Sequence, residues 1–543
     1  MTMLRGIPAA PGLAIGPALT LRPAPPVDLT ERRVLETSVE TGRLLQALEQ
    51  AIALLEGLQK TTHAPLADIL SAQREMLDDP ELKQGAIELI AAGFSAEAAI
   101  SQLATRYAEQ LTKLPDAYLA ARAEDVREVG RRVVAELRGT SATIVLTQPV
   151  ILVAHELSPA ELAGLDPTFL HAIVAETGSA TGHLAIVAQG LDIPAVIGVT
   201  DALACIEIST TLIVDGENGV VTIHPDSERL GEAEQRLLSI QRERRQMEIY
   251  RDRPGQTADG TLVEVFANIG SLAEARKAVE MGAEGVGLFR TELMAAQGLP
   301  SEEAQYAIYS EIASLLHGPL IVRTFDIGGD KPVPGLHFAT EANPFLGWRG
   351  IRLSLDQPEQ VFLPQIRALL RAAATHDIRV MFPMVTALQE VEAARALFDR
   401  AQLALTREGY AVRPMRLGIM VETPAAALTL DLFSGLIDFA SIGTNDLVQY
   451  TYAVDRTNAR VRACAQPLGI ATLRLIQHVC SSGIPIAVCG QLASDPAAIP
   501  LLVGLGVREL SVPPARIPSV KHALAALTLA EMQIRARKVL GIE

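Results

Sequence analysis

The sequence predicts an α/β protein with a C-terminal (β/α)8 TIM barrel and an N-terminal α/β domain that carries an inserted helical bundle. Three observations lead to this fold class. From about residue 260 onward, eight short apolar runs alternate with helical segments, the number of units that such a barrel needs. Between about residues 143 and 225, strand candidates alternate with short helices. Residues 34–138 instead carry apolar side chains at helical spacing.

The first 140 residues divide into an extended segment and a helical region. Residues 1–20 contain a turn at Gly6-Ile7-Pro8. The helical region predicts roughly four helices in a bundle, with breaks at Asp78-Asp79-Pro80 and Gly93 and a helix start at Asp116. Its first helix is set by Leu44, Leu45, Leu48, Ile52, Leu55 and Leu58.

The α/β region follows, and we expect its sheet to include residues 1–20. Its strand candidates are Ile144–Leu146, Ile151–Val153, Ala172–Val174, Ala195–Ile197, Thr211–Val214 and Val220–Ile223. The charged run from Ser227 to Arg251 predicts a solvated helix that joins the two halves. The predicted segments are therefore residues 1–30 with 141–225 (α/β domain), 31–140 (helical subdomain), 226–258 (helical linker) and 259–543 (barrel).

The barrel strands end in charged or polar residues. We expect the strands to begin near Leu262, Gly285, Leu320, Ile378, Leu417, Asp438, Ile484 and Glu509. Because barrel active sites lie at the C-terminal ends of the strands, the residues that follow should meet at one mouth. Strand ends deliver Arg290, Arg323, Glu422, Asn445, Asp446 and Cys489, and loops add Asp326, Lys331, Asn343, Arg349, Arg352 and Arg456.

These residue types favour a site for a small anion that carries both phosphate and carboxylate. Glu422 and Asp446 are hard oxygen ligands of the kind that Mg²⁺, or alternatively Mn²⁺, takes in proteins. The arginines are forked donors that match phosphate and carboxylate. A single arginine at a barrel mouth is as readily explained by a structural ion pair. Two carboxylates with several arginines on successive strand ends favour a binding site.

A cysteine and a histidine are the candidate reactive groups. A lone Cys489 after an apolar strand is commonly a buried filler, but its place at the predicted mouth favours a thiol that exchanges a proton with carbon. His183 follows the Gly-rich turn Gly178–Gly182 and begins an apolar helix, where exposed amides attract an anion and an imidazole can attack phosphorus. Such a histidine is by itself more often a cap; the anion-binding barrel is what favours His183. His155 and His171 are interpreted as structural.

Composition excludes several other classes. The net charge of −16 leaves no basic surplus for nucleic acid. The four cysteines show no CxxC spacing, which argues against a zinc or redox motif and fits a reducing compartment. No signal-peptide core or apolar run of membrane-spanning length is present, so we expect a cytoplasmic location without membrane insertion.

Long motifs in order give the chain a resemblance to a known family. They are Gly6–Ala14, Met76–Leu82, Tyr118–Arg127, Gly287–Glu292, Arg323–Lys331, Asn343–Arg349, Val421–Ala425, Ser441–Leu447, Ala453–Arg456 and Cys489-Gly490. Over nearly its whole length the chain resembles Enzyme I of the bacterial phosphotransferase system, the phosphoenolpyruvate–protein phosphotransferases.

The resemblance implies transfer of the phosphoryl group of phosphoenolpyruvate to a histidine and then to the phosphocarrier HPr, with release of pyruvate, as the first step of sugar transport. It implies a swivelling phosphohistidine domain, an HPr-docking helical subdomain and a homodimer through the barrel. A hinge near residues 225–260 would allow the swing. The implied roles are His183 as phosphoryl acceptor, Cys489 as the acid that protonates the enolate, Glu422 and Asp446 as Mg²⁺ ligands, and Arg290, Arg323, Lys331, Arg349, Asn445 and Arg456 as substrate-binding residues.

The chain departs from the family pattern around the histidine. Ala180 and Gly182 alter the usual loop, and Gln189 replaces a common basic residue, which removes a cation beside a phosphorylated His183. Gln491 stands where the family often has Glu, and Gln73 where some members have a second His.

Other readings remain open. A phosphorylation-dependent regulator or divergent paralogue with slow or absent transfer to HPr would fit the altered loop. Pyruvate phosphate dikinase and phosphoenolpyruvate synthase share the two folds but need an upstream ATP-binding domain, and the nitrogen-related paralogue usually has an N-terminal sensory domain. Neither extra domain fits the segments predicted here.

Overall fold

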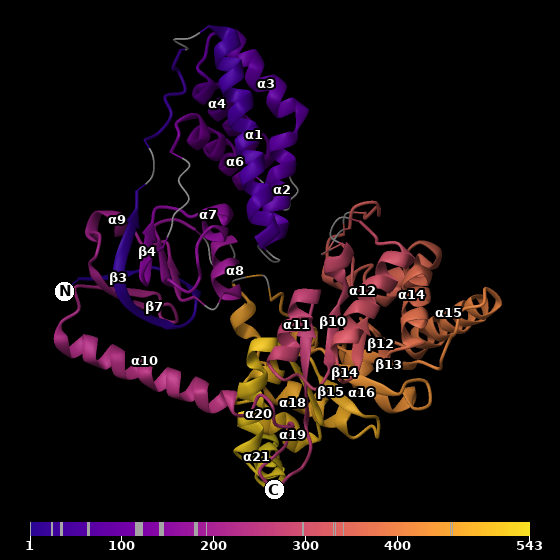
Figure 1. Ribbon diagram of the computed structural model, residues 1–543. Helices are drawn as coiled ribbons and strands as arrows, with labels where there is room; N and C mark the ends of the chain where they lie inside the picture. The colour runs from indigo at the N-terminus through magenta and orange to yellow at the C-terminus, as the bar shows by residue number, and fades with distance from the viewer. Residues whose placement is uncertain are drawn as a thin grey trace. The chain divides into compact units, whose positions relative to one another are not determined.

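The chain folds into two compact units, the first ending at Gln241 and the second beginning at Arg242 (Figure 1). The computed structural model describes residues 2–22, 25–32, 36–61, 66–113, 123–140, 146–178, 183–191, 193–295, 298–329, 331, 333–339, 341–456, 458 and 460–542. Among the helices formed by these residues, none combines the length and apolar character that a membrane span requires.

The first unit is built on an eight-stranded sheet of order β1-β8-β7-β3-β4-β5-β6-β2. Its strands are β1 (Thr2–Arg5), β2 (Ile7–Ala10), β3 (Leu13–Leu21), β4 (Val150–Ala154), β5 (Leu170–Ala175), β6 (Ala195–Ile197), β7 (Thr211–Asp215) and β8 (Val220–Ile223). Strand β3 runs parallel to β4 and antiparallel to β7, so the N-terminal segment lies inside this sheet, as expected. Of the strand predicted at Ile144–Leu146, only Leu146 is described, and it lies outside the strands.

Helices occupy the region between β3 and β4. The described ones are α1 (Thr37–Thr61), α2 (Leu66–Asp78), α3 (Pro80–Ala91), α4 (Ala96–Thr112) and α6 (Ala123–Leu137), one more than the predicted four. The breaks fall where they were predicted because capping residues stand there: Asp79 accepts the Glu81 N–H at 2.8 Å, and Ser95 accepts the Ala98 N–H at 3.2 Å. The helix start predicted at Asp116 lies outside the described residues.

The remaining helices of this unit surround the sheet and lead out of it. They are α7 (Pro159–Ala163), α8 (His183–Gly190), α9 (Ala202–Cys205) and α10 (Ser227–Glu248), the last crossing into the second unit. Helix α10 confirms the solvated helix predicted from the charged run. Its first half packs Ala233, Leu237 and Ile240 against Leu13 and Ile213 of the sheet.

The second unit is a closed barrel of eight parallel strands, which confirms the predicted fold class (Figure 1). The strands are β9 (Glu264–Ile269), β10 (Val286–Arg290), β11 (Leu320–Arg323), β12 (Ile378–Phe382), β13 (Arg416–Val421), β14 (Phe439–Ile442), β15 (Ile486–Val488) and β16 (Glu509–Val512). Each begins within two residues of its predicted start. The largest differences are in β9, which was predicted to begin at Leu262 and begins at Glu264, and in β15, which was predicted to begin at Ile484 and begins at Ile486.

Helices follow the strands and cover the outside of the barrel (Figure 1). They are α11 (Leu272–Glu280), α12 (Glu302–Leu315), α13 (Ile351–Asp356), α14 (Leu363–Ala373), α15 (Leu388–Arg407), α16 (Pro424–Leu428), α17 (Thr444–Tyr452), α18 (Ile470–Cys480), α19 (Ile499–Leu505), α20 (Ile517–Ala525) and α21 (Leu529–Leu540). Two 3-10 helices matter for the mouth: η1 (Thr291–Ala295) and η6 (Gln491–Ser494).

The barrel interior changes from apolar to polar along the strands. One buried cluster consists of Phe266, Leu288, Ile321, Met381, Met420, Phe439 and Cys489. Because strand side chains alternate between faces, the residue two positions further on points the same way. On five of these strands, that residue is polar or charged: Asn268, Arg290, Arg323, Glu422 and Ser441. An apolar layer thus supports a polar layer at the C-terminal mouth.

Candidate active site

Asp326 gathers three cations at the mouth. It is buried in the loop after β11, with carboxylate oxygens 2.8 Å from Arg349 Nη2, 3.0 Å from Lys331 Nζ and 3.4 Å from Arg323 Nη1. Burial alone would raise the pKa of Asp326, but these cations hold it well below its ordinary value. Gly328 permits the fold of the loop, since a Cβ there would lie 2.3 Å from Arg349 Cβ. The structure therefore brings Arg323, Lys331 and Arg349 together.

Two carboxylates follow the neighbouring strands β13 and β14. Glu422 follows β13 and is fully buried, and Asp446 lies in the first turn of α17. One Glu422 oxygen accepts the Met384 N–H, while Oε2 has no hydrogen-bond partner among the described residues. Asp446 Oδ1 is likewise without a hydrogen bond there and lies 3.4 Å from Arg456 Nη2. Burial, together with the negative charges of Asp326 and Asp446, raises the pKa of Glu422 to about 8.

These two carboxylates fit a divalent cation. Buried carboxylate oxygens without hydrogen-bond donors, next to other negative charges, are stabilised by a positive ion. Within the described ranges, no group of three or more His, Cys, Asp or Glu side chains forms a metal cluster. Mg²⁺ does not need one, because it is bound by one or two carboxylates and completes its shell with water and substrate oxygens.

The turns after β14 and β15 are hydrogen-bonded to each other and packed in close contact. Asn445 Oδ1 accepts the backbone N–H of Gln491 at 3.0 Å, which ties the start of α17 to η6. Gly490 lies against Thr444, where a Cβ would be 1.9 Å from the hydroxyl oxygen and 2.7 Å from the backbone nitrogen. The side-chain oxygen of Asn445 is therefore already occupied by a backbone N–H.

Cys489 lies between these turns and is 3% exposed. Its N–H donates to the Ile442 carbonyl at 3.2 Å, and its Sγ lies 3.8 Å from the same oxygen. Burial raises the pKa of the thiol to about 11, so the thiol keeps its proton at neutral pH. A protonated thiol at the mouth can act as a proton donor.

The two remaining predicted arginines are exposed. Arg290 is the last residue of β10, and Arg456 follows α17. In contrast, Arg323 is 7% exposed and Arg349 is fully buried. The mouth therefore contains two exposed guanidinium groups, those of Arg290 and Arg456, and two buried ones, those of Arg323 and Arg349.

Sequence reasoning left out three residues that hold this site. Glu292 in η1 forms an ion pair with Arg323. The hydroxyl of Tyr450 in α17 donates to the Phe345 carbonyl. Asn268 in β9 donates to the carbonyl of Cys489 at 3.0 Å. Asn268 carried a usable signal, because it is a polar residue near the end of an apolar strand; the other two depend on contacts that no local pattern shows.

The predicted histidine belongs to the other unit. His183 is the first residue of α8; its side chain and residues 179–182 lie outside the described part. The helix is anchored behind it by Leu184, Ala185, Val187 and Ala188, which are buried against the sheet. Gln189 donates to the Ala9 carbonyl at 2.6 Å, so this departure from the family pattern has a structural role.

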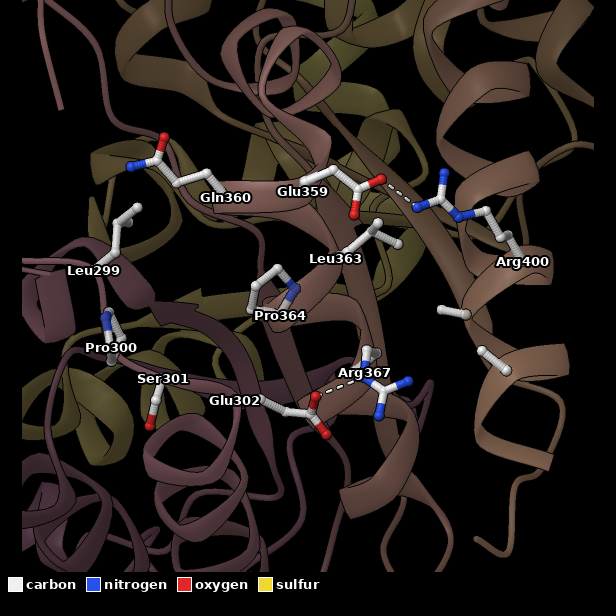
Figure 2. Close-up of a pocket in the computed structure, with 12 residues that line it drawn as sticks. Leu299, Pro300, Ser301, Glu302, Glu359, Gln360, Leu363, Pro364, Arg367 and Arg400 are labelled. Atoms are coloured by element: carbon white, nitrogen blue, oxygen red, sulfur yellow. Dashed lines mark hydrogen bonds and ion pairs between the residues drawn. The ribbon is translucent and has the colours of Figure 1, made fainter. Parts of the chain in front are cut away.

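A cavity of about 630 Å³ lies elsewhere, on the outside of the barrel (Figure 2). Its lining comes from the segment before α12, from residues 359–360 and from α12, α14 and α15, and contains no predicted site residue. Its arginines are already paired, Arg367 with Glu302 at 2.6 Å and Arg400 with Glu359. A cavity whose cations are neutralised in this way offers little to an anionic ligand.

Comparisons with known proteins show to which family the chain belongs. Residues 244–529 match the family model described as PEP-utilising enzyme, PEP-binding domain; residues 5–122 match its N-terminal model and residues 146–219 its mobile domain. The phosphoenolpyruvate-protein phosphotransferase of Staphylococcus carnosus is 37% identical over 98% of this chain and 95% of its own. That of Bacillus subtilis is 36% identical over 100% and 97%. A solution structure of an Enzyme I (nEIt) protein covers 44% of this chain and 99% of its own at 28% identity, with a TM-score of 0.38.

Proposed function

The chain belongs to the phosphoenolpyruvate–protein phosphotransferases, and from this membership we propose how its residues share the reaction. It is an enzyme that moves the phosphoryl group of phosphoenolpyruvate to a protein acceptor and releases pyruvate. The single observation that carries the assignment of residues is the mouth of the barrel, where cations and two buried carboxylates follow successive strands. Phosphoryl transfer depends mainly on such positioning and charge neutralisation.

The substrate site is proposed to use both sets of arginines. Arg290 and Arg456 are exposed and available to an incoming phosphate or carboxylate, and Asn445 in the first turn of α17 is proposed to contact the same groups. Arg323, Lys331 and Arg349 share the charge of Asp326. Direct contact of the sealed Arg349 with substrate requires its loop to move.

We propose Glu422 and Asp446 as the ligands of Mg²⁺, with Mn²⁺ as a substitute. The bound ion would neutralise negative charge on the substrate oxygens. Glu422 Oε2 and Asp446 Oδ1 would bind the ion, because neither oxygen accepts a hydrogen bond from the described residues.

His183 is the proposed phosphoryl acceptor. A ring nitrogen attacks phosphorus, the P–N bond forms as the bond to the enol oxygen breaks, and the enolate of pyruvate remains. Cys489 then gives its Sγ proton to C3 of that enolate, and the thiolate regains a proton from water.

The segments are proposed to divide the work. Residues 1–30 with 141–225 form the swivelling phosphohistidine domain, 31–140 the docking subdomain for HPr, 226–258 the linker, and 259–543 the barrel, through which two chains form a homodimer. A cytoplasmic location follows from the same proposal.

The test is to incubate the protein with ³²P-labelled phosphoenolpyruvate and Mg²⁺ and to compare wild type with His183→Ala and His171→Ala. His171→Ala is the matched control, because His171 is an exposed histidine of β5 in the same unit. Label on wild type and His171→Ala alone supports the proposal. Label that persists on His183→Ala moves the acceptor elsewhere, and the absence of label on all three points to a regulator without turnover.

A further inference from the structure

Cys489 reaches the mouth at a place where the strand ladder no longer holds its carbonyl. Strand β15 pairs with β16 through Ala487–Glu509 and Val488–Leu510, and the pairing stops there. On the other side, the Cys489 N–H is held by the Ile442 carbonyl of β14 at 3.2 Å. The N–H of Cys489 is therefore hydrogen-bonded to the backbone of a neighbouring strand, whereas its carbonyl oxygen has a partner outside the strand pairing.

That partner is the side chain of Asn268, which comes from β9, two strands away in the barrel order. Its Nδ2 donates to the Cys489 carbonyl at 3.0 Å and to the Ser511 carbonyl at 3.0 Å. Its Oδ1 accepts the Ser511 hydroxyl at 2.7 Å. Three hydrogen bonds use both amide N–H groups and the oxygen, so they fix the orientation of this amide: a flipped amide would face its oxygen to two carbonyls.

We propose that Asn268, supported by Ser511, is a positioning residue that holds Cys489 so that its thiol faces one side of the enolate. The inference rests on the role proposed above for Cys489. Because the carbonyl and the N–H of Cys489 are both hydrogen-bonded, the Cα–Cβ direction is set, and Sγ lies 3.8 Å from the Ile442 carbonyl oxygen. Asn268 itself transfers no proton.

The consequence is stereochemical. A thiol held on one face of the enolate delivers its proton to that face of C3, breaking the S–H bond and forming the C–H bond there. An enolate that is not protonated in the site leaves as enolpyruvate and takes a proton from water on either face. Phosphate binding by Arg290 and Arg323 does not depend on Asn268.

The test uses the full-length protein and phosphoenolpyruvate carrying deuterium at one C3 position, turned over in tritiated water so that pyruvate gains a chiral methyl group. Asn268→Asp keeps the shape of the side chain but places a carboxylate against two carbonyls. We expect its rate of pyruvate formation to fall about 10²-fold, with the KM for phosphoenolpyruvate within about twofold of wild type and the chiral purity reduced. Ser511→Ala, which removes one of the three bonds, should show the same pattern with a smaller loss.

Gln365→Glu is the matched control, because Gln365 is also a fully buried amide, which accepts the Phe325 N–H at 3.1 Å and donates to Tyr309 at 3.2 Å. The Gln365→Glu variant should be less stable than wild type, but the pyruvate that it forms should keep its chiral purity. Intact chirality in both Asn268→Asp and Ser511→Ala, while Cys489→Ala loses it, would overturn the positioning role alone. Intact chirality in Cys489→Ala would instead remove the role of Cys489 itself.

Discussion

At the scale of single residues, one buried carboxylate decides how the cations of the mouth are arranged. Asp326→Asn preserves the shape of the side chain and leaves Arg323 and Arg349 buried beside a neutral group. Breaking a buried ion pair from one side costs about 3–5 kcal/mol, so we expect a clearly lower melting temperature for the barrel, measured by calorimetry.

Glu408→Gln is the control for Asp326→Asn. Glu408 pairs with Arg367 at 2.7 Å on the surface, where a salt bridge contributes about 0–1 kcal/mol. Equal losses in the two variants would show that the charge of Asp326 is not what holds the arginines.

Glu422→Gln should have opposite effects with and without metal. Without Mg²⁺ and at a pH above about 8, where Glu422 is ionised, the variant should melt at or above the wild-type temperature, because it removes a buried charge that Asp326 and Asp446 repel. With Mg²⁺, wild type should gain stability by binding the ion, and the variant should gain much less. Melting curves in EDTA and in excess Mg²⁺ measure both effects; an equal gain from Mg²⁺ in the two proteins would exclude Glu422 as a ligand.

At the scale of elements, the start of β16 contains a carboxyl group whose environment favours its neutral form. Burial, together with Glu264, raises the pKa of Glu509 to about 8, against the opposing charge of Arg379. Because the folded pKa lies above the unfolded value of 4.5, the folded chain binds more protons between them. The stability contributed by protonated Glu509 is complete below the unfolded pKa and is lost as pH rises through about 8.

The substitution Glu509→Gln tests the direction of this change of stability with pH. The neutral amide does not titrate, so the variant should gain on wild type as pH increases from about 5 to 9, by roughly 1–3 kcal/mol after discounting the full pKa difference for solvent and relaxation. Melting temperatures across this pH range provide the measurement. A gap between the two proteins that is constant with pH would contradict the pKa of Glu509.

The elements themselves were predictable from local pattern, because an apolar run between helical segments indicates a strand wherever it lies. Period-two alternation also predicts the polar layer above Phe266, Leu288 and Met420. The partners of that layer were not predictable. Tyr450 reaches Phe345 across 105 residues, and Asn268 reaches Cys489 across 221, so these contacts depend on barrel closure rather than on neighbouring sequence.

At the scale of the whole molecule, the linker is fixed at both ends and solvated between them. Beyond α10, Lys521 Nζ donates to the Arg251 carbonyl at 3.0 Å, and Tyr250 packs edge-to-face against His522 with ring centroids 5.0 Å apart. Within α10, Ile240 still packs on the first unit. Beyond Ile240, the described side chains of α10 are exposed except that of Met247. Within the range 225–260 in which a hinge was expected, this stretch is the part with the fewest packing constraints.

Cutting that stretch should separate the two halves of the reaction. Limited trypsin digestion is expected at Arg242 or Arg245, because both are exposed in an unpacked stretch of helix. With the proposed role of His183, a covalent tether between the two units raises the effective concentration of the histidine for the mouth, so cleavage should slow its phosphorylation by at least about 10²-fold at micromolar protein. The barrel fragment keeps its own core and should still bind phosphoenolpyruvate with Mg²⁺, measured by calorimetry. Higher fragment concentrations should restore labelling in proportion. Labelling of His183 at the uncut rate in dilute solution would show that the halves associate without the tether and that α10 is not the element that brings them together.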